Sequence, residues 1–304
     1  MNDRGYVVVT GASTGIGQAT ATRLAAQGFV VFAGVRKSAD AERLQSQSLP
    51  GLRPLMIDVA DGESVKRAAA EVTEAVGNSG LKGLVNNAGV SFGGPLEFQD
   101  LDEIRAMFEV NVFGLIAVTQ AFLALVRKGG GRIVNMSSVG GKISVPFVSA
   151  YSATKFGVEA ISDALRVELR PWGIKVACIE PGSIATPLWE RGFEQFDKQV
   201  KNLTPEAIEL YGDLIPRMRK LTERTANAGI PPARVADAVE HALTSRGRRH
   251  ATWWVTMRAA KQCCGCCPIR AATPCWRESS ASAPRPEPKI LTCRPVLTPA
   301  AGFL

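Results

Sequence analysis

The segment YSATK places a tyrosine and a lysine, Tyr151 and Lys155, four residues apart and therefore on one face of a helix. A phenol is a poor acid or base at neutral pH because its reference pKa is about 10, and bringing that pKa to neutrality takes roughly 4 kcal/mol. One cation about 4 Å away, at an effective dielectric near 20, supplies energy of that order. Lys155 could thus make Tyr151 a general acid/base, although such a pair taken alone is usually a solvated helix face.

Two further polar features accompany this pair. Ser137 and Ser138 end the apolar run RIVNMSS, thirteen residues before Tyr151, where a hydroxyl could hold a substrate oxygen beside the phenol. Asn111 lies among apolar residues in EVNVFG. It is either a buried amide that satisfies a backbone carbonyl or a helix-bending residue that holds a water in a proton relay.

A glycine-rich loop, TGASTGIG, follows the first apolar run directly and precedes a helical pattern. Gly11, Gly15 and Gly17 remove side chains where the backbone must turn tightly and approach a pyrophosphate, and the helix N-terminus that follows supplies amide donors. In this strand-loop-helix setting the loop indicates a nucleotide site.

The elements that must position these residues alternate along the chain. Short apolar runs of strand length lie at 6–10, 29–35, 52–59, 81–87, 131–137 and 174–180, and amphipathic helical patterns lie near 15–27, 38–47, 61–76, 101–127 and 152–170. Strands so continuously apolar suit a parallel sheet covered on both faces. We therefore predict an α/β fold, a single-domain doubly wound parallel sheet (Rossmann-like), with a helical insertion at about 186–232 as a substrate lid.

Composition narrows the function classes. The chain has 304 residues and a formal charge of +8, and residues 246–304 carry 10 Lys and Arg against 2 acids, so the remainder is neutral. A neutral body argues against a basic nucleic-acid face. The N-terminus lacks the pattern of a secretory signal, and we saw no run of about 20 apolar residues. We therefore expect a cytoplasmic protein with no nucleic-acid and no membrane partner.

The C-terminal segment differs from the rest. It holds six of the seven cysteines, four of them in CCGCC at 263–267, and seven of the 18 prolines. The alternatives are a metal or redox site, a disordered basic tail, and a shifted reading frame, in which the same bases would encode Leu-Trp-Leu-Leu-Pro. A structural zinc site uses two C-x-x-C pairs that are separated by a loop, and this single run lacks that arrangement, so we expect no metal. The predicted domain is 1–250, and 251–304 is an atypical tail without the last strand and helix.

The chain resembles the classical short-chain dehydrogenase/reductase family over about residues 5–250. The resemblance rests on the glycine-rich loop, on NNAG (86–89), on Asn111 and Ser138, on the Tyr151 and Lys155 pair, and on EPGSIATP (180–187), which agree in type, order and spacing. The segments around Tyr151 and at 173–182 look closest to the retinol dehydrogenase and hydroxysteroid dehydrogenase branch.

The resemblance implies a mechanism and a set of site residues. Tyr151 would act as general acid/base, Ser138 would orient the substrate oxygen, Lys155 would lower the tyrosine pKa and bind the nicotinamide ribose, and Asn111 would complete a water relay. The implied cofactor contacts are Gly11, Ser13, Thr14, Gly15, Ile16, Gly17, Arg36, Asp58, Val59, Asn87, Ala88, Gly89, Tyr151, Lys155, Pro181, Gly182, Ile184 and Thr186. Asp58 would contact the adenine and Thr186 the carboxamide.

Cofactor choice depends on the end of the second apolar run, FAGVRK. An acid there would bind the ribose hydroxyls of NAD, but the position holds Val35, followed by Arg36 and Lys37. Cations suit a 2′-phosphate, so NADP(H) is preferred and NAD(H) is possible.

The predicted reaction interconverts a lipophilic secondary alcohol and ketone, or a retinoid-like alcohol and aldehyde. The apolar residues Phe92, Val145, Phe147, Leu188, Trp189, Phe193 and Phe196 are candidates for the pocket wall. The alternative is a non-catalytic nucleotide-sensing or scaffold protein on the same fold. The family also implies a homodimer or homotetramer that pairs the two longest helices.

Overall fold

Seven strands in the described part of the chain, residues 4–245 and 252–255 of the computed structural model, form one parallel sheet in the order β3-β2-β1-β4-β5-β6-β7. The strands are β1 (Tyr6–Val9), β2 (Val30–Val35), β3 (Leu52–Met56), β4 (Leu81–Asn86), β5 (Arg132–Met136), β6 (Lys175–Pro181) and β7 (Thr252–Val255). The strand order reverses between β1 and β4, which confirms the predicted doubly wound fold.

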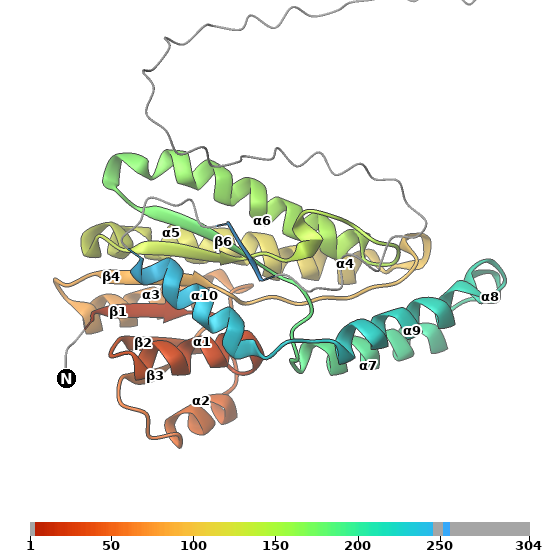
Figure 1. Cartoon of the computed structure of the whole chain (residues 1–304), viewed down its shortest axis with the longest axis horizontal. Helices are drawn as coiled ribbons and strands as arrows, with labels where there is room; N and C mark the ends of the chain where they lie inside the picture. The colour runs from red at the N-terminus through yellow and green to blue at the C-terminus, as the bar shows by residue number, and fades with distance from the viewer. Residues whose placement is uncertain (1–3, 246–251, 256–304) are drawn as a thin grey trace, which may run out of the picture. The chain divides into compact units, whose positions relative to one another are not determined.

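Helices cover both faces of the sheet, and α1 and α10 pack together on one of them (Figure 1). The helices are α1 (Gly15–Ala26), α2 (Ser38–Gln45), α3 (Gly62–Val76), α4 (Leu101–Phe108), α5 (Gly114–Gly129), α6 (Ser149–Glu168), α7 (Leu188–Lys201), α8 (Pro205–Tyr211), α9 (Leu214–Asn227) and α10 (Pro232–Thr244). Alternation along β1 explains the two layers: Val7 and Val9 pack with α1 and α10, and Val8 packs with α3 and α5. Burial of each valine contributes about 1.5–3 kcal/mol.

Two of these helices join through an irregular turn. α4, the π-helix η2 (Glu109–Phe113) and α5 form one segment, Leu101–Gly129, of 29 residues, in which an 18-residue window has a mean hydropathy of 1.8. By length and composition alone this segment could cross a membrane. Packing explains its apolarity, because Val118, Phe122 and Val126 are fully buried against the sheet.

The insertion at 186–232 is helical, as predicted. Figure 1 shows α7, α8 and α9 extending as an arm away from the sheet. The foot of the arm is held by a bridge between Ile184 and Ile230 and by the Trp189 indole, which donates to the Ile184 carbonyl at 2.9 Å. Near its tip, the Tyr211 hydroxyl donates to Glu97 at 2.8 Å.

The end of the sheet differs from the sequence-based expectation. β7 pairs in parallel with β6, from Cys178 opposite Thr252 to Pro181 opposite Val255. A last strand therefore forms inside the segment that we assigned to the atypical tail, because its backbone can extend the β6 edge whatever its side chains are. The alternatives weighed for the cysteine-rich segment, a metal or redox site, a basic tail and a shifted frame, concern residues at 256–304, which lie outside the described residues.

Candidate active site

The residues singled out in the sequence gather at one edge of the sheet. They follow the carboxyl ends of six strands: the glycine-rich loop after β1, Arg36 after β2, Asp58 and Val59 after β3, Asn87 to Gly89 after β4, Ser138 after β5, and Gly182 to Thr186 after β6. Parallel strands end on the same side, so segments more than 150 residues apart in sequence meet there.

Glycines line a cradle in this edge. A Cβ on Gly17 would lie 2.2 Å from the Gly11 carbonyl oxygen and 2.5 Å from Asn87 Nδ2. Gly15 has a φ of +58°, and a Cβ there would lie 3.0 Å from Thr186 Cγ2. The cradle therefore brings the loops after β1, β4 and β6 into contact and leaves backbone, not side chains, facing outward.

The Gly17→Ala variant tests whether this closely packed cradle binds the dinucleotide. We expect the added methyl to displace the loop and to lower the free energy of unfolding by about 1–3 kcal/mol. We also expect it to weaken dinucleotide binding, measured by tryptophan quenching alongside urea unfolding. Gly62→Ala is the matched control, because a Cβ there meets nothing within 4 Å, and it should leave both unchanged or raise stability slightly. Equal behaviour of the two variants would contradict the assignment of the cradle.

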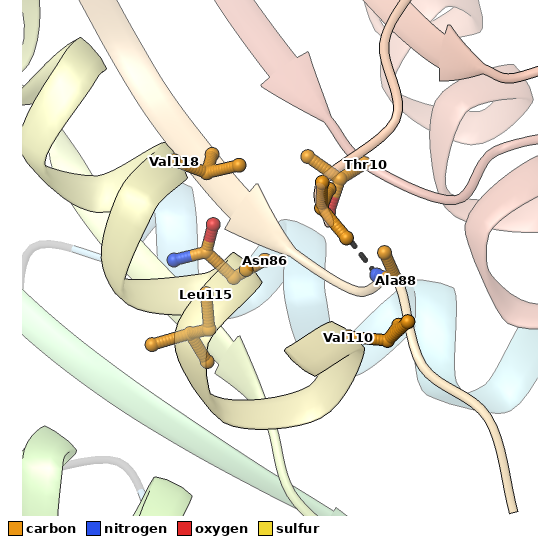
Figure 2. Close-up of a pocket in the computed structure, with 8 residues that line it drawn as sticks. Thr10, Asn86, Ala88, Val110, Leu115 and Val118 are labelled. Atoms are coloured by element: carbon orange, nitrogen blue, oxygen red, sulfur yellow. Dashed lines mark hydrogen bonds between the residues drawn. The ribbon is translucent and has the colours of Figure 1, made fainter. Parts of the chain in front are cut away.

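Thr10 organises the loop after β4, a role that we did not predict. Its hydroxyl oxygen accepts from the amides of Asn87 and Ala88 at 3.0 and 3.1 Å, and Asn87 Nδ2 donates to the Thr10 and Gly11 carbonyls. Figure 2 shows Thr10 bonded to Ala88 beside a narrow seam. The seam has a cavity volume of ≈ 0 Å³. The seam is lined by Thr10, Val59, Asn86, Ala88, Val110, Gly114, Leu115 and Val118. It is too tight for a ligand and serves to hold the loop.

Three of the predicted catalytic side chains lie together. Tyr151 and Ser138 share a hydrogen bond, and the Ser138 hydroxyl oxygen also accepts from the Gly140 amide at 3.0 Å. The Lys155 ammonium lies 5.8 Å from the centre of the Tyr151 ring and donates to the Met136 carbonyl at 2.9 Å. A side chain at Gly89 would meet Lys155 Nζ at 3.6 Å, so the ammonium borders the loop after β4.

The pKa of Tyr151 runs against our expectation. Burial raises it above the ordinary value of a tyrosine, and the hydrogen bond with Ser138 only partly offsets that rise. Lys155 does not lower the pKa of Tyr151, because its ammonium donates to the Met136 carbonyl. Burial also lowers the pKa of Lys155 itself to about 8. In the protein alone, desolvation outweighs the stabilising cation.

Asn111 lies in the π-helix, and its contacts match the simpler of our two interpretations. Its Nδ2 donates to the Val90 carbonyl at 2.9 Å and to the Thr154 hydroxyl at 3.0 Å, while its Oδ1 accepts from the Val90 amide at 2.8 Å. The amide thus ties the loop after β4 to α6. π-Bulges often occur at functional sites.

Known proteins match this arrangement. A family model described as short chain dehydrogenase matches residues 5–196. The chain belongs to the short-chain dehydrogenase family. This short-chain dehydrogenase is 40% identical over 261 residues to 17-beta-hydroxysteroid dehydrogenase type 6 of Bos taurus, with 82% of this chain and 80% of the relative covered. It is 38% identical over 256 residues to retinol dehydrogenase 16 of Mus musculus, with 82% and 80% covered.

A third relative, NADPH-dependent 3-dehydrocapnine reductase of Ornithobacterium rhinotracheale, is 35% identical over 246 residues, with 79% of this chain and 84% of the relative covered. A solved short-chain dehydrogenase from Streptomyces avermitilis has a TM-score of 0.67 and 32% identity, with 83% and 87% covered. These matches confirm the family and the branch inferred from the motifs. The chain is accordingly an oxidoreductase that acts on CH–OH groups with NAD(P).

Two arginines of this short-chain dehydrogenase border the cradle and were not predicted. Arg43 Nη2 donates to the Ser13 carbonyl at 2.5 Å, and Arg191 Nη2, from α7, donates to the Thr14 hydroxyl at 3.0 Å. Arg191 is 177 residues from Thr14, so no local pattern could connect them. Arg36 Nη1 lies 4.0 Å from Asp58 Oδ2, which places both predicted adenosine contacts side by side.

Proposed function

We propose that this short-chain dehydrogenase interconverts a lipophilic secondary alcohol and ketone, or a retinoid-like alcohol and aldehyde, with NADP(H) preferred and NAD(H) accepted. The observation that carries the proposal is the meeting of Ser138, Tyr151 and Lys155 beside the glycine cradle. A hollow of ≈ 420 Å³ at the foot of the arm borders Thr186, the predicted carboxamide contact, and has a volume that suits a small ligand, but Ser138, Tyr151 and Lys155 do not line it. The lining residues are Ala185, Thr186, Pro187, Trp189, Glu190, Phe193, Ala226 and Asn227.

The residues present fit a dinucleotide. The cradle would be filled by any Cβ on Gly17, and the Arg43 and Arg191 guanidinium groups beside it suit phosphate charge. The predicted contacts from Gly11 to Thr186 would hold it, and a bound nicotinamide supplies the hydride acceptor or donor.

The chain's own side chains would handle the substrate oxygen. In the oxidation direction the Tyr151 phenolate takes the proton of the substrate hydroxyl, and in reduction the phenol returns it. Ser138 holds that oxygen by a hydrogen bond. Lys155 would bind the ribose and keep positive charge near the phenol, and Asn111 would hold the loop after β4 against α6.

A spectrophotometric screen tests this function. Sterols, retinoids and simple ketones are offered with NADPH and with NADH, and we expect turnover of at least one lipophilic substrate. Cofactor binding without turnover across the panel would favour the alternative of a nucleotide-sensing or scaffold protein.

Arg36 carries the cofactor preference. Its side chain is exposed after β2 and contacts Asp58 only at 4.0 Å, so it can turn toward a 2′-phosphate. We expect Arg36→Ala to raise the KM for NADPH by about tenfold to a hundredfold, because a hydrogen bond to a charged group contributes about 1.5–3 kcal/mol. The KM for NADH should change little.

The matched control is Arg53→Ala, which removes an exposed arginine near the amino end of β3, the opposite edge of the sheet. It should leave both KM values at the wild-type level. Equal losses for NADPH and NADH in Arg36→Ala would speak against a 2′-phosphate contact.

We also propose a homodimer or homotetramer and a cytoplasmic location. Phe113, Phe156 and Val167 lie exposed on the helical segments 101–129 and 149–168. Such an assembly would cover this apolar surface.

A further inference from the structure

A group of three charges lies behind the catalytic residues, and none of the three was assigned a catalytic or cofactor-binding role from the sequence. The Lys142 ammonium donates to Glu159 Oε2 at 2.9 Å and lies 3.4 Å from Glu180 Oε1. Glu180 is 0% exposed and the Glu159 side chain 9%, whereas the Lys142 side chain is 36% exposed. One cation therefore enters from the surface and is held between two buried carboxylates.

Each of the three residues comes from an element that carries a reacting or cofactor-binding group. Lys142 directly follows the 3-10 turn η3 (Val139–Gly141), which Ser138 caps. Glu159 lies on α6 one turn after Lys155. Glu180 is the residue of β6 before Pro181. The ammonium thus links the serine turn, the tyrosine helix and the strand that leads to the cofactor loop.

The two carboxylates of this group depend on the Lys142 ammonium for their contacts. Neither oxygen of Glu180 has a hydrogen-bond partner, nor has Glu159 Oε1, among the described residues. Burial and the Glu159 charge raise the pKa of Glu180, and Lys142 and Arg166 oppose that rise. Removal of Lys142 would leave the two buried carboxylates, on α6 and β6, without their cation, and the turn would lose the contact that ties it to both elements.

The η3 turn is packed too closely to move without displacing its neighbours. A Cβ on Gly141 would lie 2.6 Å from Ser137 Oγ and 3.0 Å from the Lys155 carbonyl oxygen. A Cβ on Gly140 would lie 3.2 Å from Tyr151 Cε1. A shift of the backbone at 140–142 therefore reaches both Ser138 and the tyrosine ring.

We propose that Lys142 is a positioning residue for the reaction: by binding Glu159 and Glu180 it holds the Ser138 turn against α6 and keeps the Ser138 hydroxyl bonded to Tyr151. The effect of Lys142 on catalysis depends on the proposed function. The contact between Ser138 and Tyr151 can nevertheless be measured without turnover.

The experiment compares Lys142→Met, Lys142→Arg and wild type, each labelled with ¹³Cζ-tyrosine. The chain has only three tyrosines, so Tyr6→Phe and Tyr211→Phe assign the Tyr151 signal. In Lys142→Met we expect the Tyr151 signal to move and its titration to shift to higher pH, since the Ser138 bond that lowers its pKa is lost. Lys142→Arg should restore both. In turnover, kcat should fall about tenfold to a hundredfold with KM for the cofactor unchanged.

Lys66→Met is the matched control, because it removes a lysine from an exposed pair with Glu63 on α3. If Lys142→Met does not fold, Lys142→Met/Glu180→Gln removes one carboxylate together with the cation and is measured in the same way. A wild-type Tyr151 signal in either folded variant overturns the proposal, and failure of both to fold assigns the group a purely structural role. If wild type turns over no substrate while the signal still moves, the proposed function fails and the positioning role stands.

Discussion

Replacement of Tyr151 by phenylalanine is expected to lower kcat by about two to four orders of magnitude, the usual range for a lost general acid/base. The variant keeps the ring and loses only the hydroxyl that would exchange a proton with the substrate oxygen. Because the ring packs beside Gly140 and the hydroxyl bonds Ser138, the fold should be retained. Steady-state rates with a substrate from the screen, together with dinucleotide titration, measure the effect.

Tyr6→Phe provides the control for this change. Tyr6 begins β1 at the edge of the sheet opposite the site and stacks on Phe32 with ring centres 6.2 Å apart. Its loss of a hydroxyl should leave kcat unchanged. Full activity in Tyr151→Phe would show that another group moves the proton.

Replacement of Lys155 by methionine is expected to remove activity and to stabilise the fold. Lys155 is only 6% exposed, and burial lowers the pKa of its ammonium from 10.5 to about 8. Between pH 8 and 10.5 the unfolded chain therefore binds more protons than the folded one, so stability rises with pH through that window. At pH 7 the full free-energy cost of burying the charged ammonium is present. Methionine has a similar length and no charge, so it avoids that cost.

The expected gain is about 1–2 kcal/mol at pH 7, because the lost hydrogen bond to the Met136 carbonyl offsets part of the relief. Urea unfolding at pH 7 and pH 10 measures it, and the difference between variant and wild type should shrink at the higher pH. Lys66→Met, at an exposed site, should give no gain. A variant less stable than wild type at pH 7 would contradict this account of the buried ammonium.

The sequence by itself determined the elements and the chemistry of the site. Hydrophobic period, glycine placement and the four-residue spacing of Tyr151 and Lys155 are local properties, so they predicted the strands, the helices and the helical insertion with boundaries close to those observed. The motifs in the loops after these strands identified the family.

Only the tertiary structure decided which residues position the loops of the site and how burial changes the pKa of its groups. Thr10 and Arg191 act on partners more than 75 residues away, and Lys142 acts on partners 17 and 38 residues away. No spacing rule connects such positions. The raised pKa of Tyr151 depends on burial and on the direction of the Lys155 ammonium, which composition does not encode. β7 likewise formed where the side-chain pattern predicted no strand, because a sheet edge selects backbone hydrogen-bonding groups, which every residue except proline carries in full.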